Sequence, residues 1–154
     1  MDNLLVVYGI EININTAEGG GSPETWTPFG AGFNNIAESL NEVIQQYFFL
    51  SDGGYAKNFV TGMAPTLTVS GVRIIGDQAQ EFIFASGVKY GLMTARNTSI
   101  QIKRLTADAQ IETITCPVTL CNMTDIGGSS TDGSAVSLEI RFNGKPTIET
   151  GAAG

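Results

Sequence analysis

The strand pattern of this chain is clearest in Ala135-Val136-Ser137-Leu138-Glu139-Ile140-Arg141-Phe142. Apolar and polar residues alternate at every second position, which is the period of a β-strand with one buried face. We therefore expect Val136, Leu138, Ile140 and Phe142 to point into a core and the polar residues between them to lie outside. Since the same kind of pattern recurs along the chain, the sequence predicts a mainly β protein.

Five further stretches are predicted strands, at about residues 4–14, 42–50, 66–75, 99–106 and 110–121. Gly71 disturbs the alternation of the third and suits a bulge, and Pro117 marks an edge or a bulge in the last. The segment 36–50 also fits a helical stripe, but the run Tyr47-Phe48-Phe49-Leu50 favours a pleated surface. Together with a flanking helix, the strands predict an α+β variant of a β-sandwich or barrel with about six to seven strands.

That single helix is predicted at about residues 77–90. Asp77 can cap its start, Gln80 lies three residues on and can answer the cap, and Gly91 suits the left-handed position after its end. One face carries the residues expected to pack on a sheet, namely Ala79, Phe82, Ile83, Ser86 and Tyr90.

The 154 residues fit a single domain, with long loops at about 16–33 and 51–65 and a loose tail from about 144. Both loops are rich in glycine and yet carry large apolar side chains. Aromatic residues dominate the energetics of protein interfaces, so these residues are candidate subunit contacts; the alternative is that they fold back to close the ends of the barrel. The candidates are Trp26, Pro28, Phe29, Tyr55, Phe59 and Met63.

The composition excludes most catalytic and nucleic-acid-binding chemistry. Histidine is absent and charged residues make up only 15% of the chain, so the commonest general base and metal ligand are missing. The two cysteines, Cys116 and Cys121, are expected to be free thiols, because five residues of strand hold them too far apart for a disulfide. We expect no cofactor, no metal and no membrane span, and an enzyme would have to rely on carboxylates alone.

The net charge of −7 belongs to the first third of the chain. From Lys57 onward eight basic residues match eight acids, whereas residues 1–56 hold seven acids and no base. Glu38 and Glu42 would lie about 13 Å apart on one strand face, which is wider than a glycosidase pair requires. An acidic chain of this kind does not bind nucleic-acid phosphates.

Four motifs follow one another between residues 24 and 95. They are Trp26-Thr27-Pro28-Phe29-Gly30, then an aromatic strand and glycine turn at 42–56, a strand at 60–73 that contains Thr61-Gly62 and ends in Ser70-Gly71-Val72-Arg73, and a helix start at Gly76-Asp77-Gln78-Ala79-Gln80. This order resembles that of major tail tube proteins of siphophages that infect Gram-positive hosts. The resemblance implies a β-sandwich with one flanking helix whose copies form hexameric rings that stack into a tube.

The resemblance further implies a structural virion protein, assembled in the host bacterial cytoplasm, that performs no reaction. Its partners would be its own copies and other tail proteins, such as the tape measure and the tail terminator, and DNA would pass through the tube without specific binding. On this reading Glu38 and Glu42 line an acidic lumen, and the basic residues Lys89, Arg96, Lys103 and Arg104 lie at the rim or between rings, where they could face acids such as Asp52 of a neighbour. Three alternatives remain: the inner tube of a contractile tail or bacteriocin, a monomeric carbohydrate-binding β-sandwich, and a carboxylate-only hydrolase.

Overall fold

The computed structural model describes residues 4–17, 21–107 and 110–152, and within them the fold is mainly β, as predicted. Two short helices, α1 (Gln78–Ile83) and α2 (Ser86–Lys89), accompany the strands, together with single 3₁₀ turns at Val7–Gly9, Leu50–Asp52 and Met93–Arg96. The ten strands are β1 (Glu11–Asn15), β2 (Trp26–Pro28), β3 (Phe33–Ser39), β4 (Val43–Tyr47), β5 (Lys57–Gly62), β6 (Thr66–Val72), β7 (Asn97–Leu105), β8 (Gln110–Thr124), β9 (Ala135–Phe142) and β10 (Thr147–Ala152).

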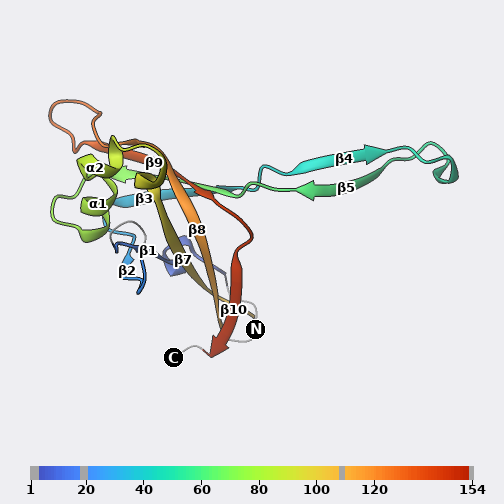
Figure 1. The fold of residues 1–154 in the computed structure, drawn as a ribbon, viewed down its shortest axis with the longest axis horizontal. Coiled ribbons are helices and arrows are strands. Elements are labelled where there is room, and N and C mark those ends of the chain that lie inside the picture. The colour runs from blue at the N-terminus through green and yellow to red at the C-terminus, as the bar shows by residue number, and fades with distance from the viewer. Residues whose placement is uncertain (1–3, 18–20, 108–109, 153–154) are drawn as a thin grey trace.

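Eight strands form one antiparallel sheet in the order β2-β1-β7-β8-β9-β6-β3, with β10 pairing with β8 as well (Figure 1). The long strand β8 holds β9 beside its C-terminal half and β10 beside its N-terminal half. Pro117 lies between these two partners and not at an edge of β8. The Pro117 carbonyl accepts a hydrogen bond from the Asn143 amide, in the β9–β10 connection, at 2.8 Å. Proline has no N–H to donate, and here it lies at the point where the partner of β8 changes from β10 to β9.

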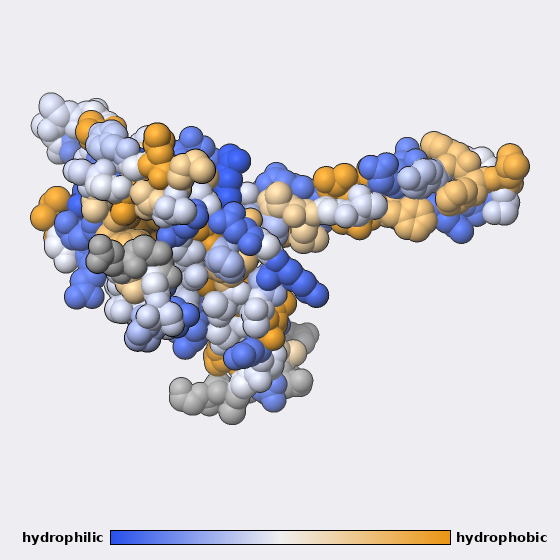
Figure 2. Space-filling model, viewed as in Figure 1, coloured by the Kyte–Doolittle hydropathy of each residue, from blue (hydrophilic) through white to orange (hydrophobic). Residues whose placement is uncertain are grey.

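Strands β4 and β5 form a second sheet of their own, which projects from the body as a narrow hairpin (Figures 1 and 2). We call residues 43–62 the arm. At its base the Ala64 amide donates to the Leu40 carbonyl at 2.9 Å, and the Asn41 amide side chain donates to the Ala64 carbonyl at 3.0 Å. The two chain segments that enter and leave the arm are therefore held side by side.

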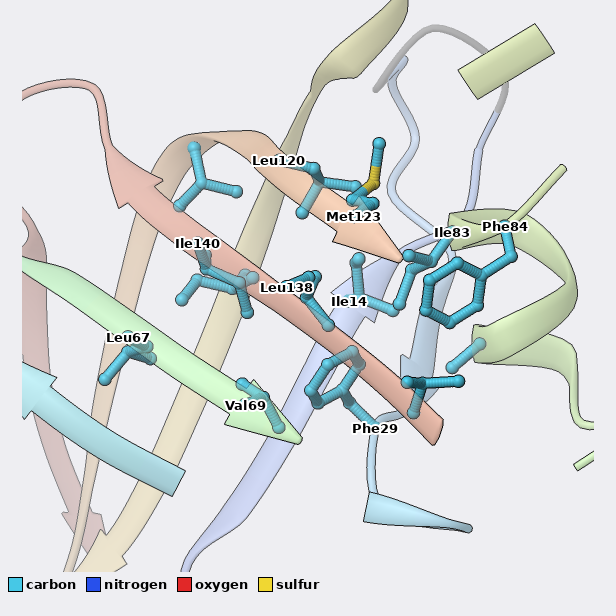
Figure 3. Packing of buried hydrophobic residues seen from close by; sticks show 14 residues of the cluster. Ile14, Phe29, Leu67, Val69, Ile83, Phe84, Leu120, Met123, Leu138 and Ile140 are labelled. Atoms are coloured by element: carbon cyan, nitrogen blue, oxygen red, sulfur yellow. The ribbon is translucent and has the colours of Figure 1, made fainter. Parts of the chain in front are cut away.

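The core lies between the two halves of the main sheet (Figure 3). Ile14 of β1 and Ile100 of β7 belong to the same buried cluster as Val69 of β6 and Leu138 of β9, so the sheet folds over on itself around them. The predicted inward residues of β9 are confirmed: Val136, Leu138 and Ile140 are buried and Phe142 is half-buried.

The predicted helix is present as two short helices. The Asp77 cap is confirmed, since its Oδ2 accepts from the Gln80 amide at 3.1 Å. Ile83 and Phe84 are both buried. Helix α1 ends at its C-cap Phe84 and α2 starts anew from its N-cap Ala85, so Tyr90 is exposed instead of sharing a buried face with Ile83. The prediction for Gly91 is wrong, because its backbone is not left-handed.

Gln80 does not return to Asp77 as a capping box would require. Its buried amide instead donates to the carbonyls of Ala31 and Val72, each at 3.0 Å, and accepts from the Ile74 amide at 2.8 Å. The side chain thereby ties α1 to the start of β3 and the end of β6.

The predicted loops and tail were too long. The first contains β2 and the second contains β5, and the tail contains β10, which pairs with Gln110–Thr115 of β8. Residues 18–20 of the first loop and 153–154 of the tail lie outside the described residues. At the N-terminus the predicted strand 4–14 was also too long: Val7–Gly9 make a 3₁₀ turn and pairing begins at Glu11.

Candidate assembly surfaces

The arm exposes apolar side chains along its whole length. Every residue of β4 is exposed and β5 is exposed up to Gly62, and the arm surface is apolar over much of its length in Figure 2. Around the tip, Phe48 is 66% exposed, Tyr55 is 80% exposed and Leu50 is fully exposed. Exposed aromatic and aliphatic groups of this size lose much of their unfavourable hydration when a partner covers them.

Little within the arm stabilises it by itself. The Tyr47 ring stacks on Phe49 at 5.7 Å and meets the edge of Phe59 at 6.0 Å, and Lys57 lies 3.5 Å from Asp52 across the turn. A two-stranded hairpin in water is marginally stable at best. Contact with a neighbouring molecule would therefore stabilise the arm as well as cover it.

The structure separates the residues predicted to make subunit contacts. Tyr55, Phe59 and Met63 lie exposed in or at the base of the arm, whereas Trp26 and Pro28 lie on β2 of the body. The prediction for Phe29 is wrong: its ring is 6% exposed and stacks on Phe33 at 4.5 Å within the core. The residues predicted from the sequence to make subunit contacts did not include Phe48 and Leu50. Their position in an aromatic run without polar residues at alternate places was the signal that could have indicated them.

A second group of exposed apolar residues lies in the segments next to the two helices, which are at the end of the molecule away from the arm (Figure 1). Its side chains come from the loops next to α1 and α2 and from the β8–β9 connection. We call it the helix-end patch, and its residues are Ile75, Tyr90, Leu92, Met93 and Ile126. The molecule therefore carries exposed apolar surface at both ends of its long axis.

Most of the basic residues predicted to face a neighbour already have partners within the chain. Lys89 pairs with Asp125, whose carboxylate raises the pKa of the Lys89 ammonium group. Arg104 pairs with Glu112 at 2.7 Å, and Arg96 donates to the Gly91 carbonyl at 2.8 Å. Lys103 lies opposite Glu11 in the β1–β7 register. The acid expected to meet them, Asp52, pairs with Lys57 of its own arm.

The outer face of the main sheet is polar over β3, β6, β9 and the C-terminal half of β8. Directly opposed residues of antiparallel strands point to the same side of a sheet. The strand register therefore shows which residues share the outer face, and the alternate residues, such as Leu67 and Ile140, point to the core. We call it the hydroxyl face. Its residues are Asn35, Ala37 and Ser39 of β3, Thr66, Thr68 and Ser70 of β6, Ser137, Glu139 and Arg141 of β9, and Thr119, Cys121 and Thr124 of β8.

The two charged residues of the hydroxyl face neutralise each other. Arg141 Nη2 lies 3.3 Å from Glu139 Oε2, and Asn122 donates to the same oxygen. The hydrogen bond from Asn122 and then that from Arg141 lower the pKa of Glu139 below its ordinary value, so the carboxylate stays ionised beside its partner. Glu38 is not part of this face, because it opposes Leu67 on the core side of the sheet, and Glu42 is exposed at the base of the arm.

Both cysteines are free, as predicted, with Cys116 buried and Cys121 half-buried. Among the described residues there is no group of three or more acidic or cysteine side chains that could hold a metal ion. None of the helices in that part of the chain is long and apolar enough to cross a membrane. The hollow next to the free edge of β3, about 470 Å³, is lined mainly by apolar residues such as Ile12, Phe33 and Ile36.

Solved structures with the same chain architecture come from phage tails and related particles. The chain in a structure described as the tail of an empty gene transfer agent particle, refined with C6 symmetry, superposes with a TM-score of 0.66 at 16% identity, over 95% of this chain and 99% of that one. The SPP1 tail tube gives a TM-score of 0.62 at 10% identity, over 97% and 80%. The chain has the fold of a tail tube subunit.

A more distant match is a chain in the sixfold-symmetrised baseplate of the anti-feeding prophage, with a TM-score of 0.55 at 10% identity, over 99% of this chain and 98% of that one. No protein-family model and no curated protein sequence matches the chain. The likeness is thus one of fold, and it extends over nearly the full length of the described body and arm.

Proposed function

We propose that this chain is a structural subunit of a phage tail tube, in which copies close into rings of six and the rings stack around a channel for DNA. The observation that carries the proposal is the arm, an exposed apolar hairpin on a body with the fold of a tail tube subunit. A monomer in water would gain nothing from such a projection, whereas a neighbouring copy would cover it. Two of the similar structures have sixfold symmetry, which supports rings of six.

The two apolar ends of the molecule suit a head-to-tail contact. The arm and the helix-end patch are different surfaces. A contact in which either of them binds a different part of the next copy is therefore heterologous, and heterologous contacts form a closed ring when the successive rotations add up to a full turn. We assign subunit contacts to Tyr55 and Phe59 of the arm, to Met63 at its base, and to Trp26 and Pro28 of β2. The subunit catalyses no reaction and needs no cofactor.

The finer assignment follows the sequence resemblance. We place the protein in the virion tail of a siphophage with a Gram-positive host, assembled in the host cytoplasm with a tape measure and a tail terminator as further partners. The second candidate is the inner tube of a contractile tail or bacteriocin, and the match to the anti-feeding prophage baseplate favours it. Isolated particles would separate the two, since a contractile tail carries a second protein layer around its tube.

Removing the arm tests the proposal. Because the Leu40 and Ala64 backbones are hydrogen-bonded at its base, residues 42–63 can be replaced by a short glycine turn without moving β3 or β6. We expect the full chain to sediment as rings and longer polymers at high concentration, and the shortened chain to remain a folded monomer. A full chain that stays monomeric at every concentration would refute the proposal.

A further inference from the structure

The turn between α2 and β7 holds two apolar side chains out in solvent. We call residues 91–96 the Met93 turn. Leu92 and Met93 are 81% and 85% exposed, and the backbone of Met93 is left-handed, with a φ of 57°. Side chains other than glycine rarely adopt this conformation. Where they do, the surrounding structure holds them in it, and such strained residues cluster at functional sites. The Met93 turn is therefore a candidate contact.

The surroundings of the Met93 turn fix it in this strained form. The Arg96 guanidinium donates to the carbonyls of Gly91 at 2.8 Å and Leu120 at 3.5 Å, so the turn is closed on itself and tied to β8. A Cβ atom at Gly91 would lie 2.3 Å from the Gly87 carbonyl oxygen and 2.6 Å from the Ala95 Cβ, so only glycine fits there. A turn that is already ordered loses little conformational entropy when a partner covers it.

The hollow beside the free edge of β3 offers a matching apolar surface. Its volume is about 470 Å³, and its walls include the half-buried side chains of Ile12, Phe33 and Ile36. The described residues that line the hollow carry no charge, and the one charged residue of the Met93 turn, Arg96, is engaged with backbone carbonyls. Contact between the turn and the hollow would therefore bury no unpaired charge, which is the costly case.

The Met93 turn and the hollow lie on opposite sides of the subunit. The hollow is bounded by β1 on one side and by β3 on the other. Along the sheet, β8 is reached from β1 through β7, and from β3 through β6 and β9. The turn leads directly into β7 and is bonded to Leu120 of β8. It thus lies across the core from the hollow and cannot fill the hollow of its own copy, whereas a heterologous contact joins two such different surfaces.

We propose that the Met93 turn of one copy packs Leu92 and Met93 into the hollow beside β3 of the next copy around the ring. The inference rests on the proposed function and adds a second contact to the covered arm. The C6 symmetry of the similar gene transfer agent tail supports a second copy as the occupant. Methionine suits this role, because it is enriched in the buried cores of protein interfaces.

Disulfide trapping tests the contact. A chain with Cys121→Ala, Asn34→Cys and Met93→Cys carries one accessible thiol at the hollow, which Asn34 lines, and one on the turn, since Cys116 is fully buried. Oxidised tubes should give a ladder of linked copies in denaturing gels that ends at six, because each ring closes. Chains that carry only one of the two new cysteines are the control and should give no ladder.

The Met93→Gly variant separates the contact from folding. Glycine adopts a left-handed backbone without strain, so the urea midpoint of the free subunit should not fall. The lost side chain should nevertheless raise the subunit concentration at which polymers form by about tenfold. A Met93→Leu chain keeps an apolar side chain and should change that concentration much less.

The outcomes separate the two proposals. Tubes that give no ladder, or a ladder that runs beyond six copies, would overturn this contact and leave the proposed function standing. An unchanged polymerisation threshold for Met93→Gly would also overturn it, because Met93 would then lie outside the interface between copies. Absence of rings and tubes from the unaltered chain would overturn the proposed function and this inference with it. If the cysteine chain does not fold, the comparison of Met93→Gly with Met93→Leu decides alone.

Discussion

Replacing Phe48 by alanine should weaken assembly without unfolding the subunit. Phe48 is 66% exposed in the free chain and lies on the arm, outside the core cluster. Full burial of a phenylalanine contributes about 1.5–3 kcal/mol, so covering the exposed two thirds contributes about 1–2 kcal/mol for each arm. Since 1.4 kcal/mol is a tenfold change in an equilibrium constant, the subunit concentration at which polymers form should rise about 5- to 30-fold.

The assay is pelleting of polymers over a concentration series, with thermal unfolding of the free subunit measured beside it. Phe48→Leu is the matched control, because it keeps an apolar side chain and should lose much less. The reasoning would be refuted by an unchanged polymerisation threshold for Phe48→Ala. It would also be refuted by a clear fall in the melting temperature of the monomer, because Phe48 would then stabilise its own subunit.

Three further variants test the body of the subunit. Phe29→Ala should destabilise the monomer by about 3–5 kcal/mol, because it removes a buried ring from the core; a urea midpoint like that of the unaltered chain would place Phe29 elsewhere. Gln80→Leu leaves the Ile74 amide and the Ala31 and Val72 carbonyls without their partner, and each lost hydrogen bond should cost about 0.5–1.5 kcal/mol in urea unfolding; no loss would show that the Gln80 hydrogen bonds do not stabilise the fold. The backbone amide of Gly76 and then Arg73 lower the pKa of Glu81, so its stabilisation is present above the pKa of the unfolded chain and disappears as the pH falls through the lowered folded pKa. Glu81→Gln should accordingly lose stability at neutral pH and show a shallower decline on acidification, and parallel curves for the two chains would contradict this.

The sequence predicts those elements whose two faces meet different surroundings. Strand β9 has the predicted bounds, Ala135–Phe142, because Val136, Leu138 and Ile140 face the core while the residues between them face solvent. The Asp77 cap was predictable for a similar reason, since the interaction joins residues three positions apart. Local patterns of this kind need no knowledge of the rest of the fold.

The arm could not be predicted from alternation, because both of its faces are exposed and neither contacts a core. The segment 36–50 contains parts of two strands, β3 and β4, on either side of Asn41. The left-handed backbone of Asn41 turns the chain into the arm. Phe29 and Phe48 are the same type of residue, but Phe29 is buried and Phe48 is exposed. What separates them is the pairing of β2 with β1, a tertiary contact.

Electron microscopy of the purified chain at high concentration tests the central claim most directly. The account predicts rings with sixfold symmetry and stacks of such rings, with the arm of each copy covered by a neighbour and an open channel along the axis. Featureless monomers under the same conditions, with the arm still exposed, would contradict it.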